Sequence, residues 1–320
     1  VTATTQRINQ ILGDYGYAFS NANAIPEVNK ETRTVDFNYF IDPGKKIYVR
    51  RLNFFGNEKT RDSVIRRELR QFESSWYSKT KVDRSKTRLS NTQYFDDIDV
   101  ETVSVPGVTD QIDINIYLKE RNTGKLMLGA GVSSDEGLVG TFTVSQSNFL
   151  GTGNTVTTSV STGSVNKTYA LSYSDPYWTD NGVSRTVGAY KRDVNTSDLS
   201  TADYNTYSYG ANLDFTVPTS EFNAIAVGAT LDLTEIKLGA YANPEYVKYC
   251  QNLTGTVAGN DCNSDSFTIT STYATDTRNN ATMPTDGIYF RSGLSLSLPV
   301  LDMQFYKLSF AGERHWPMAN

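Results

Sequence analysis

The sequence predicts a small α+β domain followed by an antiparallel transmembrane β-barrel, of which roughly ten strands are present. Up to residue 122, apolar residues recur at both helical and strand spacing, whereas from residue 123 only two-residue alternation remains. The chain is rich in strand-forming aromatics, with 20 Tyr and 15 Phe, and most of its Ser and Thr lies beyond Gly124. No run approaches the roughly 18 apolar residues of a membrane-spanning helix, so a helical membrane protein is excluded.

Residues 1–43 look like the C-terminal part of an α+β unit. Ile8, Ile11 and Leu12 recur at helical spacing, and the segment "TVDFNYFID" at 34–42 alternates as a strand. The helix is therefore expected to precede at least one strand, as at the end of such a unit.

Residues 44–122 predict one complete α+β unit with the order β-α-α-β-β. A strand, "IYVRRLNFFGN", ends in a Gly-Asn turn, and "FDDIDVETVSV" and "QIDINIYLKE" are the two closing strands. Between them, one helix is marked by Val64, Ile65, Leu69 and Phe72, and another, behind Ser78, by Val82 and Leu89. Such a unit should place its helices on one face of a sheet.

Residues 123–320 predict the N-terminal part of an outer-membrane β-barrel. Tight connections such as "LGTGN" and "TDNG" alternate with longer polar ones, which include 193–203 and 237–265. Outer-membrane barrels sort their connections in this way, whereas a soluble sandwich has less reason to do so. In "YALSYSDPYWTDNG", we expect Tyr169, Leu171 and Tyr173 to face lipid and the small residues between them to face the interior.

Cys250 and Cys262 are the two cysteines of the chain, and they lie in a long polar loop. Their close spacing favours a disulfide in an oxidising compartment. Two unrelated reduced thiols are the alternative interpretation.

Charge and composition narrow the function classes. With a net charge of −5, the chain lacks the basic field of a nucleic-acid binder, and its dense basic segment, 61–70, fits a solvated helix face or a surface for a partner protein. The single histidine, His315, is expected at a strand end and not in a catalytic dyad. The acidic side chains of Asp96, Asp97 and Asp99 are expected on an exposed strand face and not at a cation site. We therefore predict no enzymatic activity, no metal and no cofactor.

The first barrel strand carries the candidate binding site. Its glycines, Gly129 and Gly131, weaken strand pairing, so the seam that this strand forms should be the easiest place to open. An open edge offers unpaired N–H and C=O groups to an incoming strand. Close packing or barrel curvature is the structural alternative for the glycines. The residues of this predicted lateral-gate strand are Leu126, Met127, Leu128, Gly129, Ala130, Gly131, Val132 and Ser133.

Several of these segments together resemble a known family. The segments "FFGNEKTRDSVIRRELRQ" and "KVDRSKTRLSNTQYFDDIDV" resemble the polypeptide-transport-associated (POTRA) repeat. "KERNTGKLMLGAGVSSDEGLVGTFTVSQSNFLGTGN" resembles the start of the barrel in the BamA family of outer-membrane protein assembly factors, and "DPYWTDNG" and "MPTDG" match that family's periplasmic turns. Family barrels have sixteen strands and a late surface-loop Arg motif, so the chain is expected to be a fragment.

The resemblance implies a function without catalysis. Family members fold and insert client barrel proteins into the outer membrane of Gram-negative bacteria, with client strands pairing at the first barrel strand and the POTRA part in the periplasm. The expected partners are unfolded outer-membrane protein clients, periplasmic chaperones, accessory lipoproteins and the lipid bilayer. In "RRELRQFE", the resemblance implies lipoprotein contacts for Arg66 and Glu73. The alternative is a POTRA-barrel polypeptide exporter of the two-partner secretion type.

Overall fold

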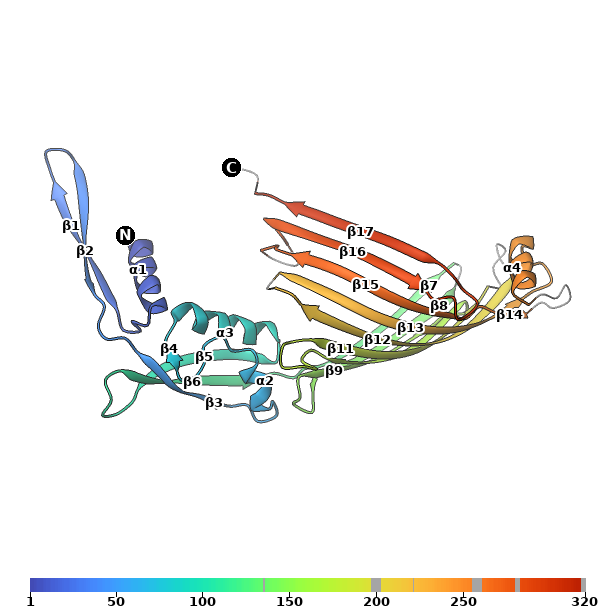
Figure 1. Cartoon of the computed structure of the whole chain (residues 1–320), viewed down its shortest axis with the longest axis horizontal. Helices are drawn as coiled ribbons and strands as arrows, with labels where there is room; N and C mark the ends of the chain where they lie inside the picture. Colours follow the sequence, from blue (N-terminus) through green and yellow to red (C-terminus); the bar gives the residue numbers. More distant parts are fainter. Residues whose placement is uncertain (135, 197–202, 221, 255–260, 280–282, 318–320) are drawn as a thin grey trace. The chain divides into compact units, whose positions relative to one another are not determined.

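The computed structural model describes residues 1–134, 136–196, 203–220, 222–254, 261–279 and 283–317. Parts of the two predicted long connections, 197–202 and 255–260, lie outside these ranges. The chain divides into two compact units (Figure 1). The first comprises Val1–Thr123 with Leu150–Thr152, and the second comprises the remaining residues from Gly124 to Asn320. In the described part of the chain, no helix is long and apolar enough to cross a bilayer.

The chain begins with a helix and a two-stranded antiparallel sheet. Helix α1 spans Thr2–Asp14, strand β1 spans Asn21–Asn29 and strand β2 spans Thr34–Asp42. The helix and β2 are confirmed, whereas β1 has no strict alternation and was not foreseen from the sequence.

A four-stranded sheet follows, in the order β4-β3-β6-β5. Strand β3 pairs in parallel with β6, and β5 pairs with β6 in antiparallel fashion. Helix α3 lies along one face of the sheet (Figure 1). The elements are β3 (Tyr48–Phe55), α2 (Asp62–Arg66), β4 (Ser75–Trp76), α3 (Lys79–Asn91), β5 (Phe95–Ser104) and β6 (Gln111–Glu120).

This sheet and its helices enclose the main hydrophobic core. Alternate residues of β6, from Ile112 to Leu118, are buried, and they pack with Ile65 of α2 and Leu89 of α3. The Gly-Asn turn after β3 has a steric reason. Gly56 has φ +84°, and a Cβ there would lie 2.1 Å from the carbonyl oxygen of Leu118, so a side chain does not fit.

The structure differs from the predicted β-α-α-β-β unit in two details. Helix α2 ends at Arg66, and Phe72 is 59% exposed instead of lying on a buried helix face. The short strand β4 was not foreseen. The second helix is confirmed, and Ser78 caps it by accepting a hydrogen bond from the Lys81 N–H at 3.3 Å.

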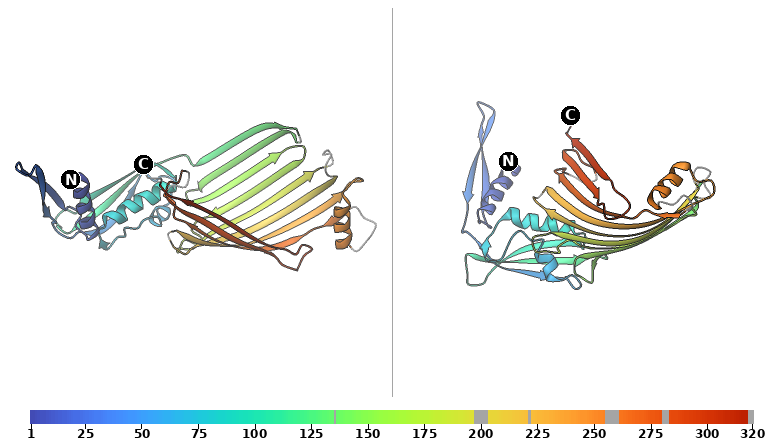
Figure 2. Two further views of the ribbon diagram at one scale, coloured as in Figure 1. Left: turned by 90° about the horizontal axis from the view of Figure 1, so that it is seen from above. Right: turned by 45° about the vertical axis from the view of Figure 1, so that its right-hand side comes forward.

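The second unit is one large antiparallel sheet, which curves along its length (Figure 2). Its main path contains ten strands in the described ranges, in chain order from β7 to β17, with the short β14 paired to the end of β13. The strands are β7 (Gly124–Ser133), β8 (Gly137–Phe149), β9 (Asn154–Thr162), β10 (Asn166–Asp175), β11 (Ser184–Asn195), β12 (Tyr204–Pro218), β13 (Asn223–Leu238), β14 (Asp261–Asn263), β15 (Ser266–Asp276), β16 (Gly287–Ser297) and β17 (Tyr306–His315).

Strand registers place the predicted apolar residues on a common face, here called the outward face. Tyr173 lies opposite Val156 of β9 and Val187 of β11, and Val187 in turn lies opposite Leu213 of β12. Directly opposed residues of an antiparallel pair point to the same side, so the predicted alternation of faces is confirmed. That this face contacts lipid remains a prediction.

The two ends of the sheet are less different than predicted. We call the end where β8 meets β9 the turn end and the opposite end the loop end. The connection 239–265, which contains helix α4 (Pro244–Thr254), is indeed long, and it lies at the loop end. The loop-end connections 134–136 and 163–165 are tight, however, and the turn-end connection 277–286 is long. The expected sorting by length therefore holds only in part.

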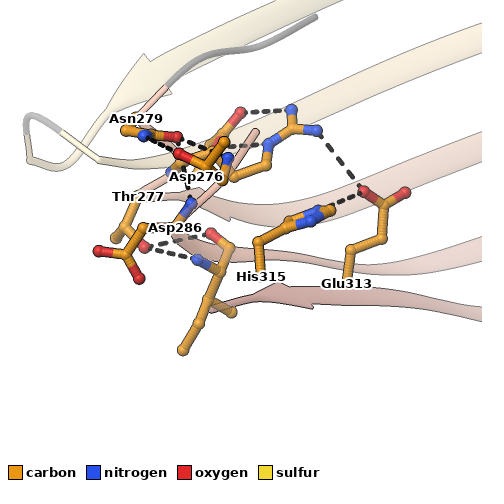
Figure 3. Close-up of polar contacts among 9 residues, drawn as sticks. Asp276, Thr277, Asn279, Asp286, Glu313 and His315 are labelled. Carbon is orange, nitrogen blue, oxygen red and sulfur yellow. Dashed lines mark hydrogen bonds and ion pairs between the residues drawn. The ribbon is translucent and has the colours of Figure 1, made fainter. Parts of the chain in front are cut away.

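The sequence "MPTDG" belongs to that turn-end connection, between β15 and β16. The side-chain oxygen of Asn279 accepts hydrogen bonds from the N–H groups of Thr285 and Asp286, at 3.0 and 3.3 Å (Figure 3). Gly287 has φ +114°, and a Cβ there would lie 2.4 Å from the Thr277 carbonyl oxygen. Asn279 and Gly287 therefore fix the turn.

Candidate functional site

Strand β7, the predicted lateral-gate strand, is an edge of the large sheet among the described residues. Its partner within these ranges is β8, through a register that runs from Gly124 opposite Gln146 to Ser133 opposite Gly137. All of its residues are exposed, and the side chains of Leu128 and Val132 are 73% and 86% exposed. A strand in this position presents backbone groups along one side.

The two glycines of β7 differ in their surroundings. A Cβ on Gly129 would lie 2.4 Å from the hydroxyl oxygen of Thr141 on β8, whereas a Cβ on Gly131 would meet nothing within 4 Å. Close packing, the alternative considered for both, therefore applies to Gly129 alone in this structure. Gly131 makes the strand adaptable without filling a packing role.

Arg66 and Glu73 lie together at the edge of β3. Glu73 accepts a hydrogen bond from the Leu52 N–H at 2.9 Å, and Arg66 lies 3.3 Å from the same carboxylate oxygen. The Arg66 guanidinium also donates to the Leu52 carbonyl at 3.4 Å and packs over the ring of Phe54. Two side chains thus satisfy the backbone groups that a neighbouring strand would otherwise pair.

These contacts lower the pKa of Glu73. The Leu52 N–H contributes most, partial burial opposes it, and Arg66 adds to the lowering. Glu73 is therefore a stable carboxylate, and its side chain is still 39% exposed. An accessible anion beside a cation suits a polar protein contact.

Sequence reasoning missed a polar network on the inner face of the sheet, opposite to the outward face. The Tyr190 hydroxyl donates to Asp232 at 2.5 Å, and the Thr234 hydroxyl donates to the other oxygen of the same carboxylate at 3.0 Å. The Tyr190 ring lies against Gly210, where a Cβ would be 2.2 Å from the ring carbon Cζ. A large residue opposite a glycine on the neighbouring strand is the signal that could have revealed this pair.

The histidine, the aspartates of β5 and the two cysteines make local contacts. His315 lies at the end of β17, and its Nε2 is 3.5 Å from a carboxylate oxygen of Glu313 (Figure 3). Asp96 lies 3.6 Å from Arg121, while Asp97 and Asp99 accept hydrogen bonds from the N–H of the residue that follows each of them. Cys250 of α4 and Cys262 of β14 form a disulfide.

Comparison with known proteins identifies both units. Residues 148–320 match the Omp85 superfamily domain, and residues 47–121 match a POTRA domain described as a surface antigen variable number repeat. The outer membrane protein assembly factor BamA of Neisseria meningitidis is 33% identical over 323 aligned residues, which cover 100% of this chain and 40% of that protein. The chain thus spans less than half the length of this relative.

Solved structures agree with this assignment. The crystal structure of Haemophilus ducreyi BamA lacking POTRA domains 1–3 superposes with a TM-score of 0.80 and 30% identity, covering 97% of this chain and 59% of that one. CdiB from Acinetobacter baumannii has a TM-score of 0.51 and 13% identity, covering 96% of this chain and 54% of that one, and so shows likeness of fold alone. Because the Omp85 superfamily domain matches more than half of its residues, the chain belongs to the Omp85 superfamily.

Proposed function

We propose that this chain is part of a barrel-assembly factor that folds client proteins into the outer membrane by strand pairing at β7. The observation that carries the proposal is that β7, the first strand of the large sheet, contains Gly129 and Gly131 and lies at an edge of that sheet among the described residues, in a chain of the Omp85 superfamily. Main-chain pairing is tolerant of client sequence, which suits many substrates. Folding and lipid burial of the client supply the free energy, so no nucleotide or cofactor is invoked.

The POTRA unit, Tyr48–Glu120, has a separate role in this proposal. It would lie in the periplasm, receive clients from chaperones and bind accessory lipoproteins. The exposed carboxylate of Glu73 and the adjacent Arg66 support a lipoprotein contact, because both are held in place by the backbone of Leu52 and keep polar surface toward solvent.

A disulfide lock tests the seam in the full-length protein. One cysteine replaces Gly131 and the other is placed on the terminal barrel strand, which closes the seam. The matched control joins Gly131→Cys to Val139→Cys, its register partner on β8, and so ties β7 without closing the seam. We expect the seam lock to block client assembly and the control to preserve it, with reductant restoring the locked protein. Normal assembly with the seam locked refutes strand templating.

The polypeptide exporter is the second candidate, and the same lock separates it. An exporter conducts its substrate through a central pore, so it should tolerate closure of the seam. Loss of assembly in the locked protein, reversed by reductant, would therefore favour the assembly factor over the exporter.

A further inference from the structure

On strands β10, β11 and β12, the residues of the outward face change from apolar to aromatic and basic toward the loop end. In the middle of the sheet, opposed residues of β10, β11 and β12 are apolar, such as Leu171, Ala189 and Ala211. Two residues further toward the loop end along each strand, on the same face, Tyr169 lies opposite Lys191 and Lys191 lies opposite Tyr209. Across β10, β11 and β12, the outward face therefore changes from apolar residues to one lysine between two tyrosines, whereas Val160 of β9 and Leu233 of β13 keep the same row apolar on either side.

Four side chains make up this Lys–Tyr patch: Lys167, Tyr169, Lys191 and Tyr209. Lys167 lies opposite Asp193 and is thus diagonal to Lys191, at a Cα separation of about 7 Å. The Lys191 ammonium lies 5.6 Å from the centre of the Tyr209 ring. The side chains of Tyr169 and Tyr209 are 45% and 53% exposed. Two exposed aromatic rings therefore lie beside two lysines that are close enough to contact the same anionic group of a ligand.

The charges of the patch favour an anionic ligand. Lys191 is paired with Asp193 at 3.3 Å, and Lys167 has no ion pair among the described residues. Glu136, in the connection between β7 and β8, accepts a hydrogen bond from Asn166, whose side chain lies on the inner face. The patch on the outward face therefore keeps one positive charge in excess.

Further along the same face the balance reverses. Lys237 of β13 lies 3.2 Å from Glu235 and opposite Asp261 of β14, so one cation meets two carboxylates there. The excess of positive charge is thus local to β10 and β11, and it does not extend over the whole loop end.

We propose that the Lys–Tyr patch binds the phosphorylated sugar headgroup of an outer-leaflet glycolipid. Lysines at a membrane interface extend toward anionic headgroups while their stems remain in apolar surroundings. Tyrosine rings supply flat surfaces for sugar rings, which favours a phosphorylated glycolipid over a glycerophospholipid. The chain enters the sheet from the POTRA unit at Gly124, at the turn end, so the patch lies at the opposite end. The inference rests on the proposed outer-membrane placement and is independent of client pairing at β7.

Binding to defined vesicles tests the patch in the full-length protein. The vesicles are phosphatidylcholine containing lipopolysaccharide or, at equal charge, phosphatidylglycerol. The double variant Lys167→Gln/Lys191→Gln should bind lipopolysaccharide about five- to tenfold more weakly, as two screened ion pairs predict. The matched control, Arg192→Gln/Lys307→Gln, removes two cations near the loop end on the inner face and should bind normally.

Tyr169→Leu tests sugar recognition separately. This variant should weaken binding to lipopolysaccharide and leave binding to phosphatidylglycerol unchanged. Equal losses in the two double variants, or equal affinity of the wild-type protein for both lipids, would overturn the proposal. Circular dichroism checks that each variant keeps its β-sheet content. Client assembly is measured on the same vesicles, so failure of assembly with intact lipid selectivity counts against the proposed function alone.

Discussion

Asp14 joins the helix that precedes the POTRA unit to the start of helix α3. Its carboxylate accepts hydrogen bonds from the Ser78 hydroxyl at 2.9 Å, the Thr80 N–H at 2.8 Å and the Thr80 hydroxyl at 2.7 Å. The helices approach closely here, because a Cβ on Gly13 would lie 3.0 Å from the Cβ of Lys79. Asp14 therefore acts as an additional cap for a helix more than sixty residues away in the chain.

We predict that Asp14→Ala loosens the first turn of α3. Loss of a capping carboxylate costs about 1 kcal/mol at an exposed position such as this one. Hydrogen exchange at the Thr80 amide should therefore accelerate about fivefold, because 1.4 kcal/mol corresponds to roughly a factor of ten. Asp14→Asn keeps one acceptor oxygen and should lose less protection. Mass spectrometry of the full chain measures both.

Asp83→Ala is the matched control for this prediction. Asp83 lies on the same helix and pairs with Lys79 at 2.8 Å, but both side chains are about half exposed, so its removal should change protection by less than about twofold. If Asp14→Ala leaves exchange at Thr80 equal to that of the Asp83 variant, the inter-helix cap has no energetic role and the reasoning fails.

The cap should also depend on pH. Partial burial raises the pKa of Asp14, but the hydrogen bonds from Thr80 and Ser78 outweigh burial and hold the pKa below its ordinary value of 3.8. A carboxyl whose pKa is lower in the folded state stabilises that state above its unfolded pKa. Its contribution to stability is lost as pH falls through the folded pKa. Protection at Thr80 should therefore be constant near neutrality and decline below about pH 4, and the decline should be absent in Asp14→Ala.

The remaining predictions concern β3 and β7. Glu73→Ala should speed hydrogen exchange of the Leu52 amide about fivefold, because this buried donor loses its acceptor. Glu73→Gln keeps an acceptor oxygen and should largely preserve protection of the same amide. Equal exchange rates in both variants would show that the Glu73 side chain does not hold this edge. Gly129→Ala should weaken β7–β8 pairing by about 1 kcal/mol because its Cβ crowds Thr141, and Gly131→Ala should not. Amide exchange along β7 measures the difference, and equal effects of the two alanines would contradict it.

Strand patterns were predictable because the two faces of each sheet differ strongly. In the sequence, residues from Tyr207 to Val217 alternate between apolar and small or polar side chains, and β12 spans Tyr204–Pro218 accordingly. By contrast, β4 is only two residues long and pairs through Tyr48 and Val49, so it is too short to show a period. Helix α4, in the long loop, was likewise not foreseen.

Site residues divide in the same way. The position of β7 followed from the change of periodicity after Gly124, which is a local signal. By contrast, the carboxylates of Glu73 and Asp14 accept hydrogen bonds from the N–H groups of Leu52 and Thr80, which are far away in the chain. No local sequence pattern predicts these contacts. The error at Phe72 has a related cause, since helical spacing does not reveal that α2 stops at Arg66.

The Tyr190–Gly210 contact has a consequence for how the sheet can vary in evolution. The ring occupies the volume that any side chain at position 210 would need, so the two positions are mutually conditional. A larger residue at 210 requires that the Tyr190 ring move or be replaced by a smaller side chain, and either change removes the Tyr190 hydroxyl from Asp232. Natural variants should therefore change these three positions together. Covariation among them would then report the pairing register of β11, β12 and β13.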